Sequence, residues 1–428
     1  MPASPVKTGT ERHLYRAMDD FCTQLPPAEF MAQFAEFVPL AAETVSLARA
    51  RGRIVAEPLT SQEALPPFSR SLMDGYAVRA VDTSDCSETE AVLAVIGEIT
   101  TGASGQALSL EPGQAIRIWT GGELPQGADA VVIVECTRSL DRGEVAVFRP
   151  VAPGENVIRA GADYTPGTVI FEAGHRLRSQ DLGMLAGLGI ASLPVYRQPR
   201  VAIFSTGNEL VPPDQTPPPG KVRNINSTTL TALVEETGGL ALPCGICPDD
   251  FDRLLALCAE ALREADMLLL SGGSSMGRHD FTRQVFSAIP GSKMLVPGVS
   301  VRPGKPAILA CQGNKALFGL PGHTASALIG FIRFVRPLLR LYAGLGATLG
   351  LSAVRAITDQ PIFSTIGREE HVLIRLTPQT DGTLPLATPV SVKSGLLGPL
   401  LQTHGLLPIG RSVERLAKGA EATVLLFP

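Results

Sequence analysis

A glycine- and serine-rich segment, Ser271 to Gly277, follows the apolar run at 267 to 270. Backbone N–H groups in such a loop can bind a phosphate, and the N-terminus of a following helix adds a favourable partial charge. The segment lacks the Gly-Lys-Ser/Thr ending of a nucleotide-binding P-loop. A simple tight turn is the alternative, so this loop alone leaves both interpretations open.

Two cations, Arg302 and Lys305, stand in the string RPGKP at 302 to 306. Its rigid prolines limit the entropy that the segment loses when the cations hold an anion. Solvated surface charges are the alternative. We favour phosphate or oxyanion binding.

Isolated carboxylates lie in glycine-containing turns at Asp74, Asp163, Glu209 and Asp280. Hard oxygen ligands of this kind suit Mg²⁺, which takes one or two carboxylates together with substrate phosphates and water. Each carboxylate alone is better explained as a helix cap or a turn contact. Their number favours a combined metal and anion site.

The elements that must position these residues begin at Val201, where short apolar runs alternate with helical periodicity. This pattern is typical of parallel strands joined by crossover helices. Strands are predicted at 201–204, near Leu240, at 267–270 and at 316–320. Helices are predicted after Asn226 or Ser227, after Asp249 or Asp250, and at 324–342, where Pro337 should kink or end the regular part. Ligands bind beyond the carboxyl ends of parallel strands, where the loops 205–209 and 271–280 fall.

The two flanks of this α/β region differ from it in pattern. A helical stretch is expected near 28–50, a mostly antiparallel β module at about 64–160, and a short linking helix at 182–193. From about Leu351, short alternating runs with frequent glycine and proline predict a small β domain.

Composition narrows the function. A chain of 428 residues should hold two to four domains. The formal net charge of −4 and the 5% aromatic content disfavour a nucleic-acid partner. No segment resembles a signal peptide or a membrane span, which predicts a cytoplasmic protein without a membrane partner.

Seven scattered cysteines suit a reducing compartment. Cys244 and Cys247 form a C-x-x-C, but no second pair or nearby histidine completes a set of metal ligands. A redox or zinc role is therefore less favoured than two small residues at the end of a strand.

Eight strings stand in this order between about residue 30 and the C-terminus: SLMDGYAV, RIWTGGELPQGADAVV, GENVIRAGADY, LAGLGIASLPVYRQPRVAIFSTGNEL, RNINSTTL, SGGSSMGRHDF, RPGKPAIL and GLPGHTASAL. In order and spacing they resemble the motifs of the molybdopterin molybdenumtransferases, the family of bacterial MoeA and the C-terminal part of gephyrin.

The resemblance implies a multidomain α/β plus β protein: a MogA-like three-layer α/β domain, a β lid, a helical linker domain and a C-terminal β barrel. The implied boundaries are an N-terminal extension at 1–25, a discontinuous linker at 26–63 and 164–198, the lid at 64–163, the molybdopterin-binding α/β domain at 199–345 and the barrel at 346–428. It also implies a homodimer, with the α/β domain of one subunit facing the lid of the other.

Site residues carry over by motif. The implied catalytic residues are Asp74, Thr120, Asp163, Glu209 and Asp280, of which Glu209 and Asp280 would also hold Mg²⁺. The implied substrate-binding residues are Ser205, Thr206, Gly207, Asn226, Asp249, Ser271, Gly272, Gly273, Ser274, Ser275, Arg302, Lys305, Pro321 and Gly322.

The implied reaction is insertion of molybdate into adenylylated molybdopterin with release of AMP. A molybdopterin adenylyltransferase and apo-molybdoenzymes are possible further partners. Alternatives are a paralogue that binds the pterin cofactor as carrier or scaffold, and an adenylyltransferase or nucleotide hydrolase built on the same α/β domain. The sequence does not distinguish molybdate from tungstate.

Departures from the family pattern occur at Asn208, Arg278, His279, His323 and Thr324, and they make the local charge more positive. They leave the interpretation as an anion site intact. They make tight metal binding and normal turnover less expected.

Overall fold

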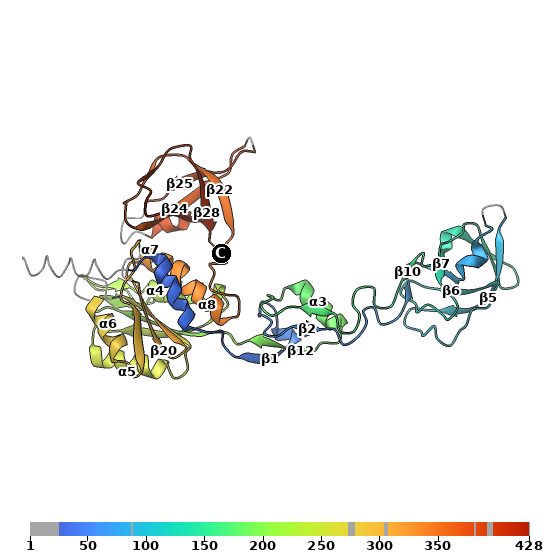
Figure 1. The fold of residues 1–428 in the computed structure, drawn as a ribbon, viewed down its shortest axis with the longest axis horizontal. Helices are drawn as coiled ribbons and strands as arrows, with labels where there is room; N and C mark the ends of the chain where they lie inside the picture. Colours follow the sequence, from blue (N-terminus) through green and yellow to red (C-terminus); the bar gives the residue numbers. More distant parts are fainter. Residues whose placement is uncertain are drawn as a thin grey trace, which may run out of the picture. The chain divides into compact units, whose positions relative to one another are not determined.

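The computed structural model describes residues 25–86, 89–272, 279–303, 307–380, 382–391 and 397–427, with only the backbone at 279 and 280. Contacts divide the chain into two compact units (Figure 1). Unit 1 comprises the described residues up to Glu43, Gly52–Ala56 and those from Val195 onward. Unit 2 comprises Thr44–Arg51 and Glu57–Pro194.

A six-stranded sheet forms the centre of the α/β domain in unit 1. Its spatial order is β16 (Leu240–Cys247), β13 (Arg200–Thr206), β17 (Met267–Gly272), β21 (Lys315–Leu320), β20 (Ile308–Gln312) and β18 (Ser292–Val296). The first four strands are parallel, and β20 and β18 are antiparallel to their neighbours. Because both faces are covered, β13 and β17 are buried along almost their whole length, and the predicted apolar runs 201–204 and 267–270 lie within them.

Helices cover the two faces of this sheet (Figure 1). On one face lie α2 (Pro27–Ala32), α4 (Asn226–Glu236), α7 (Thr324–Gly330) and α8 (Arg336–Tyr342); on the other lie α5 (Phe251–Ala261) and α6 (His279–Ala288). Side chains alternate along β13, so Val201 and Ile203 join one core and Ala202 and Phe204 the other. The Asp250 side chain accepts from the backbone N of Arg253, which confirms one of the two predicted caps of α5.

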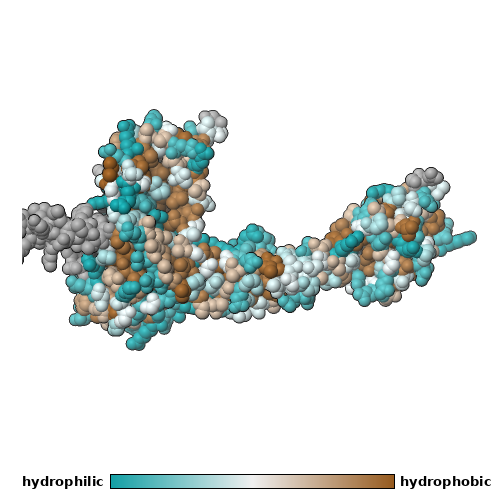
Figure 2. Space-filling view, in the orientation of Figure 1, coloured by the Kyte–Doolittle hydropathy of each residue, from teal (hydrophilic) through white to brown (hydrophobic). Residues whose placement is uncertain are grey.

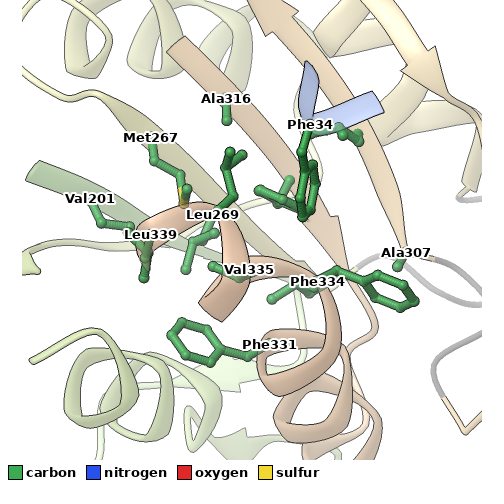
Figure 3. Packing of buried hydrophobic residues seen from close by; sticks show 14 of the residues in the cluster. Phe34, Val201, Met267, Leu269, Ala307, Ala316, Phe331, Phe334, Val335 and Leu339 are labelled. Atoms are coloured by element: carbon green, nitrogen blue, oxygen red, sulfur yellow. The ribbon is translucent and has the colours of Figure 1, made fainter. Parts of the chain in front are cut away.

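The segment before β13 completes the first core. Phe30 and Phe34 are buried there, and the Phe30 ring lies 4.3 Å from that of Phe334. Figure 3 shows Phe34 and Phe334 in this core. The predicted helix over 28–50 is wrong beyond its first turns, because α2 and the 3-10 turn η1 (Gln33–Glu36) give way to β1 (Ala42–Ser46) and η2 (Leu47–Arg49).

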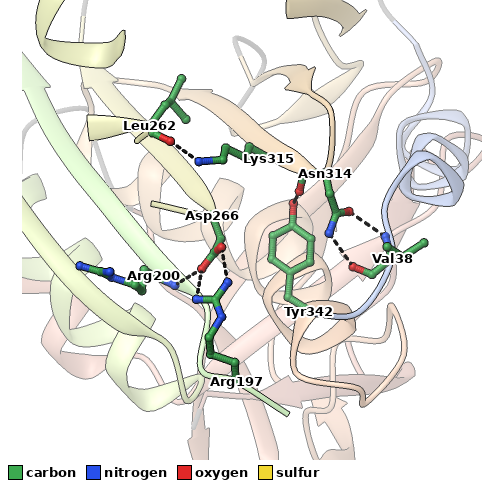
Figure 4. A network of polar contacts seen from close by, with 8 residues as sticks. All are labelled: Val38, Arg197, Arg200, Leu262, Asp266, Asn314, Lys315 and Tyr342. Carbon is green, nitrogen blue, oxygen red and sulfur yellow. Dashed lines mark hydrogen bonds and ion pairs between the residues drawn. The ribbon is translucent and has the colours of Figure 1, made fainter. Parts of the chain in front are cut away.

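Polar contacts fix the chain where it enters the sheet (Figure 4). The Asp266 carboxylate accepts from both terminal nitrogens of Arg197, at 2.6 and 2.9 Å, and from the backbone N of Arg200 at 2.8 Å. Nearby, the Tyr342 hydroxyl donates to the carbonyl of Asn314, and burial raises the pKa of this tyrosine.

The predicted helix over 324–342 is interrupted earlier than expected. A π-helical segment, η5 (Phe331–Val335), separates α7 from α8. Pro337 lies in the first turn of α8, where a missing N–H is tolerated. Regular helix continues after the proline, so Pro337 does not end the helix, and the irregular segment lies directly before it.

The C-terminal part of unit 1 is a β barrel, as predicted. Its sheet runs β19 (Val301–Arg302), β24 (Glu369–Thr377), β25 (Leu386–Pro389), β22 (Ala353–Thr358), β28 (Glu421–Leu426) and β26 (Gly405–Ile409). Pairing of β26 back onto β24 closes five of these strands, with β19 added outside the ring. Ile374, Leu407 and Val424 fill its interior.

Unit 2 carries a second six-stranded sheet. The order is β7 (Ala130–Ile133), β4 (Gly75–Val78), β6 (Gln114–Ile118), β5 (Ala91–Ile99), β9 (Glu144–Val147) and β8 (Thr137–Leu140). All pairs are antiparallel except β5 with β6, which agrees with the predicted β module.

Smaller elements of unit 2 flank this sheet: the pairs β2 (Leu59–Thr60) with β11 (Val169–Phe171) and β3 (Arg70–Ser71) with β10 (Val157–Ile158), and the helix α3 (Ser179–Gly187). The helix predicted over 182–193 is misplaced, because Ser192 to Tyr196 form the strand β12. Gly189 has a φ of 70°, which a helix does not accommodate.

Candidate functional site

The carboxyl ends of β13 and β17 meet side by side in the α/β domain. Ser205 is opposite Ser271 and Thr206 is opposite Gly272. Gly272 has a φ of 128°, and a Cβ there would lie 2.1 Å from the carbonyl oxygen of Thr206. This close approach requires glycine. The parallel register thus brings the two predicted loops together.

The start of α4 adds polar groups to this edge. The Ser205 hydroxyl donates to Oδ1 of Asn224 at 3.0 Å, and the backbone N of Ser227 donates to the same oxygen at 3.2 Å. The side chain that accepts from the first turn is therefore that of Asn224. The predicted caps, Asn226 and Ser227, lie inside the helix.

Asn226 links α4 to the loop that precedes α7. Its Nδ2 donates to the carbonyl of Gly322 at 2.8 Å, and the side chain is almost fully buried. Its Oδ1 is also buried and has no hydrogen-bond partner among the described residues. A buried acceptor without a donor is unfavourable, so a ligand that donates here would gain an interaction.

A cavity of about 1190 Å³ opens at this edge. Predicted residues that line it are Ser205, Thr206, Glu209, Asn226, Ser271, Gly272, Arg302 and Gly322. The divergent residues His323 and Thr324 also line it. Gly207, Asp249 and Pro321 do not belong to the lining.

Part of the cavity wall comes from the C-terminal barrel, which the sequence analysis did not place in the site. It includes Phe363, Glu370 and His371, and Arg223 lines the α/β side. The charged string Arg-Glu-Glu-His at 368–371 is the signal that could have indicated this wall. The local sequence pattern does not predict that this string lies at the cavity, because its position depends on pairing between β19 and β24.

The turn after β13 exposes the Glu209 carboxylate. A Cβ on Gly207 would lie 2.6 Å from either oxygen of that carboxylate, so the glycine leaves room for it. Asn208 accepts from the backbone N of Asp249 at 3.2 Å, and Lys221 donates to the Asn208 carbonyl. Asp249 thus supports the turn from behind.

Two predicted residues of unit 2 touch each other. Oδ1 of Asp74 accepts from the Thr120 backbone N at 2.8 Å and from its hydroxyl at 2.6 Å. These two hydrogen bonds, the hydroxyl one first, hold the pKa of Asp74 below its usual range. The Asp74 side chain is partly exposed, and because its pKa is lowered it is an anion over the whole neutral range.

Large apolar side chains neighbour this pair: Leu72, Met73 and Trp119 are 47%, 43% and 37% exposed. Figure 2 shows hydrophobic patches among hydrophilic residues on the surface of unit 2. Asp163 lies in a different loop of the unit, where its backbone N donates to the carbonyl of Leu65 at 2.9 Å.

Several predicted residues lie outside the described part of the chain. They are Gly273, Ser274, Ser275, Arg278 and Lys305, together with the side chains of His279 and Asp280 and the extension up to residue 24. Asp280 belongs to the first turn of α6 by its backbone.

The C-x-x-C occurs at the end of β16, as expected for structural residues. Cys244 is exposed as a residue and Cys247 is buried, and loss of water around each sulfur raises the pKa of both thiols. A raised pKa disfavours the reactive thiolate. In the described ranges, no three His, Cys, Asp or Glu side chains are grouped as metal ligands. Within the same ranges, no helix has the length and apolar character needed to cross a membrane.

Comparison with protein families matches three consecutive segments. Residues 25–189 match "MoeA N-terminal region (domain I and II)", residues 202–341 match "Probable molybdopterin binding domain" and residues 355–427 match "MoeA C-terminal region (domain IV)".

Individual relatives match over most of their length. The molybdopterin molybdenumtransferase of Nostoc sp. is 36% identical over 393 residues, covering 90% of this chain and 89% of the relative. That of Bacillus subtilis is 33% identical over 391 residues, covering 90% of each. A crystal structure of the molybdopterin biosynthesis MoeA protein from Pyrococcus horikoshii matches with a TM-score of 0.83 at 33% identity, covering 95% of this chain and 99% of that one.

Proposed function

The chain belongs to the molybdopterin molybdenumtransferase family, and on that premise we propose that it inserts molybdate into adenylylated molybdopterin and releases AMP. The observation that carries this proposal is that Glu209, Arg302 and the ends of β13 and β17 line the same cavity. The enzyme is a transferase of molybdenum cofactor biosynthesis.

Both substrates are anions, which is the main physical demand on the site. Molybdate and the pyrophosphate-linked adenylate repel each other in water-poor surroundings unless cations and oriented donors offset the charge. Arg302 and Arg223 supply positive charge at the cavity wall, and Ser205, Ser271 and the Asn226 amide supply polar groups. We assign Lys305 and the loop from Gly273 to Ser275 to the same task by motif.

We propose Mg²⁺ as the cofactor. Glu209 presents an exposed carboxylate to the cavity, which suits the role of metal ligand. One or two carboxylates suffice when phosphates and water complete the shell. Asp280 is the second proposed ligand. When bound, the ion would offset the charge on the phosphates.

We further propose that the complete site needs two chains. Asp74, Thr120 and Asp163 of one subunit would face the cavity of its partner in a homodimer. Leu72, Met73 and Trp119 are exposed beside the Asp74 carboxylate. Apolar side chains of this size gain from burial, which supports the proposal that a partner subunit covers this surface.

The alternatives are less well supported. An adenylyltransferase that consists of the α/β domain alone would form its site without a barrel. In this chain Phe363 and Glu370 of the barrel line the cavity, which disfavours that alternative. A carrier that binds the pterin without inserting metal would keep the cavity but not release AMP. We expect a cytoplasmic enzyme that takes its substrate from a molybdopterin adenylyltransferase and passes the product to apo-molybdoenzymes.

One assay tests the reaction. Purified protein is incubated with adenylylated molybdopterin, Mg²⁺ and either molybdate or tungstate, and AMP release and reconstitution of an apo-molybdoenzyme are measured. We expect AMP release that depends on the oxyanion. Binding of the nucleotide without AMP release would favour the carrier instead. The rates of AMP release with molybdate and with tungstate, measured at equal concentration, give the metal preference.

A further inference from the structure

Arg302 is held by the barrel although it belongs to the connection between two strands of the α/β domain. Val301 and Arg302 form β19, which pairs in parallel with β24 of the barrel. Val301 is opposite Glu369 and Arg302 is opposite Glu370. Residues directly opposite in a sheet project from the same face. The side chains of Arg302 and Glu370 are therefore neighbours, and both line the cavity.

The contact between these two side chains is an ion pair. Oε1 of Glu370 lies 3.8 Å from Nε of Arg302, which is longer than a hydrogen bond. The Glu370 side chain is 15% exposed and that of Arg302 is 60% exposed. The contact runs through Nε, which leaves the two terminal nitrogens of the guanidinium to donate to another group. Oε2 of Glu370 is buried and has no hydrogen-bond partner among the described residues.

Glu369 and His371, on either side of Glu370, hold β24 against η5 of the α/β domain. Arg333 in η5 donates to Oε1 of Glu369 at 2.7 Å and to Nε2 of His371 at 3.1 Å. His371 is buried, and Ile329, Ile332 and Leu373 pack beside this contact. Glu370 therefore has a defined place relative to the ends of β13 and β17.

We infer that Glu370 is a positioning residue of the oxyanion site: it orients the Arg302 guanidinium towards an anionic substrate in the cavity. An exposed arginine otherwise samples many rotamers and loses that freedom on binding. A carboxylate beside Nε reduces this cost, because the side chain is partly ordered before the anion arrives. The barrel thus contributes to anion binding by orienting Arg302, which lies between two strands of the α/β domain in the sequence. This inference rests on the proposed function.

Steady-state kinetics with molybdate as the varied substrate test it. Glu370→Ala should raise KM for molybdate about fivefold, the upper range for an ion pair in which one partner is exposed, while kcat stays within about twofold. Glu370→Gln keeps an oxygen that can accept from Nε, so its KM should stay within about twofold of the wild type. Glu421→Ala is the matched control, because it removes the carboxylate of another ion pair on the barrel, with Arg355, outside the cavity.

A double-mutant cycle separates positioning from general damage. In an Arg302→Ala background, Glu370→Ala should change KM no further, because the residue it orients is gone. An equal rise in both backgrounds, an unchanged KM, or a fall in KM for Glu370→Gln overturns the inference. If Glu370→Ala does not fold, Glu370→Asp withdraws the carboxylate by one methylene and enters the same cycle.

Titration calorimetry with molybdate alone makes the two proposals separable. A wild-type protein that releases no AMP contradicts the proposed function. The inference is then decided by whether Glu370→Ala weakens molybdate binding in the wild-type background and not in the Arg302→Ala background.

Discussion

Asp74 accepts two hydrogen bonds from Thr120, one from its hydroxyl at 2.6 Å and one from its backbone N at 2.8 Å, although the residues are 46 positions apart. The hydroxyl bond is the largest cause of the lowered pKa of Asp74. Thr120→Val should therefore raise that pKa. Since the ionised form is the one we assign to the site, the loss of activity in acid should begin at a higher pH in this variant. A pH profile of AMP release measures the shift, and an unshifted acid limb would show that Asp74 does not govern it.

Subunit complementation tests the shared site. Asp74→Ala and Asp280→Ala chains should each be inactive, and mixed dimers should recover part of the activity because one of their two sites is intact. Recovery to roughly a quarter of wild type follows if chains pair at random. Light scattering that finds only a 45.1 kDa monomer at micromolar concentration, or mixtures without activity, would count against the proposal.

Asp280→Asn should abolish molybdate-dependent AMP release while the protein stays folded and still binds the pterin nucleotide. The amide keeps the shape of the side chain but removes the charge, and loss of one such electrostatic contact costs about 10² to 10³ in rate. Arg278, two residues away in the sequence, could reduce the effect. Near wild-type turnover at limiting Mg²⁺ would refute the metal assignment and favour the binding-only paralogue. Glu209→Gln provides the parallel measurement at the described ligand.

The C-x-x-C should be dispensable. Cys244→Ser and Cys247→Ser should each leave activity within a few fold, because the described residues around them supply no further metal ligands and burial raises the pKa of both thiols. Activity and zinc content are measured together. Loss of stoichiometric zinc along with activity would contradict this prediction.

Stability should depend on the protonation of His371. Burial, the largest cause, lowers the pKa of this residue despite its contact with Glu369, so the folded protein favours the neutral ring. The unfolded chain takes up a proton near a pH of about 6.5, so this contribution is present above that pH and is lost below it. The unfolding temperature should fall between pH 7.5 and 5.5 by less in His371→Phe than in wild type. His323→Gln replaces an exposed histidine and serves as the control. Its unfolding temperature should fall over this pH range by as much as that of the wild type.

The sequence predicted the parts of the fold that depend on local pattern. The apolar runs at 201–204 and 267–270 are strands, and the residues just beyond them, Ser205 and Ser271, line the cavity. Parallel strands place their carboxyl ends together whatever the details of the connecting helices. Eight of the residues that the family resemblance implies for substrate binding and catalysis, Ser205 and Ser271 among them, line this one cavity.

The parts that failed depend on contacts distant in sequence. Glu370 faces Arg302 because β19 joins a sheet whose other strands begin some fifty residues later, and no local period records that pairing. Leu47 to Arg49 have helical composition, but the preceding residues form β1 and leave room for only one 3-10 turn. Tertiary pairing overrides local preference in both cases.

The docking of the first described segment has a consequence for synthesis on the ribosome. Val38 exchanges two hydrogen bonds with the Asn314 side chain, 276 positions later, and Phe30 packs against Phe334. At about 5 to 20 residues per second, the nascent chain spends roughly 14 to 55 s between these two points. Unit 2 can fold in that interval, since all of it, Thr44–Arg51 and Glu57–Pro194, is made between these two points. During this interval Phe30 and Phe34 lack the later residues against which they pack in the folded protein. We expect a chaperone to bind this exposed apolar segment of the nascent chain.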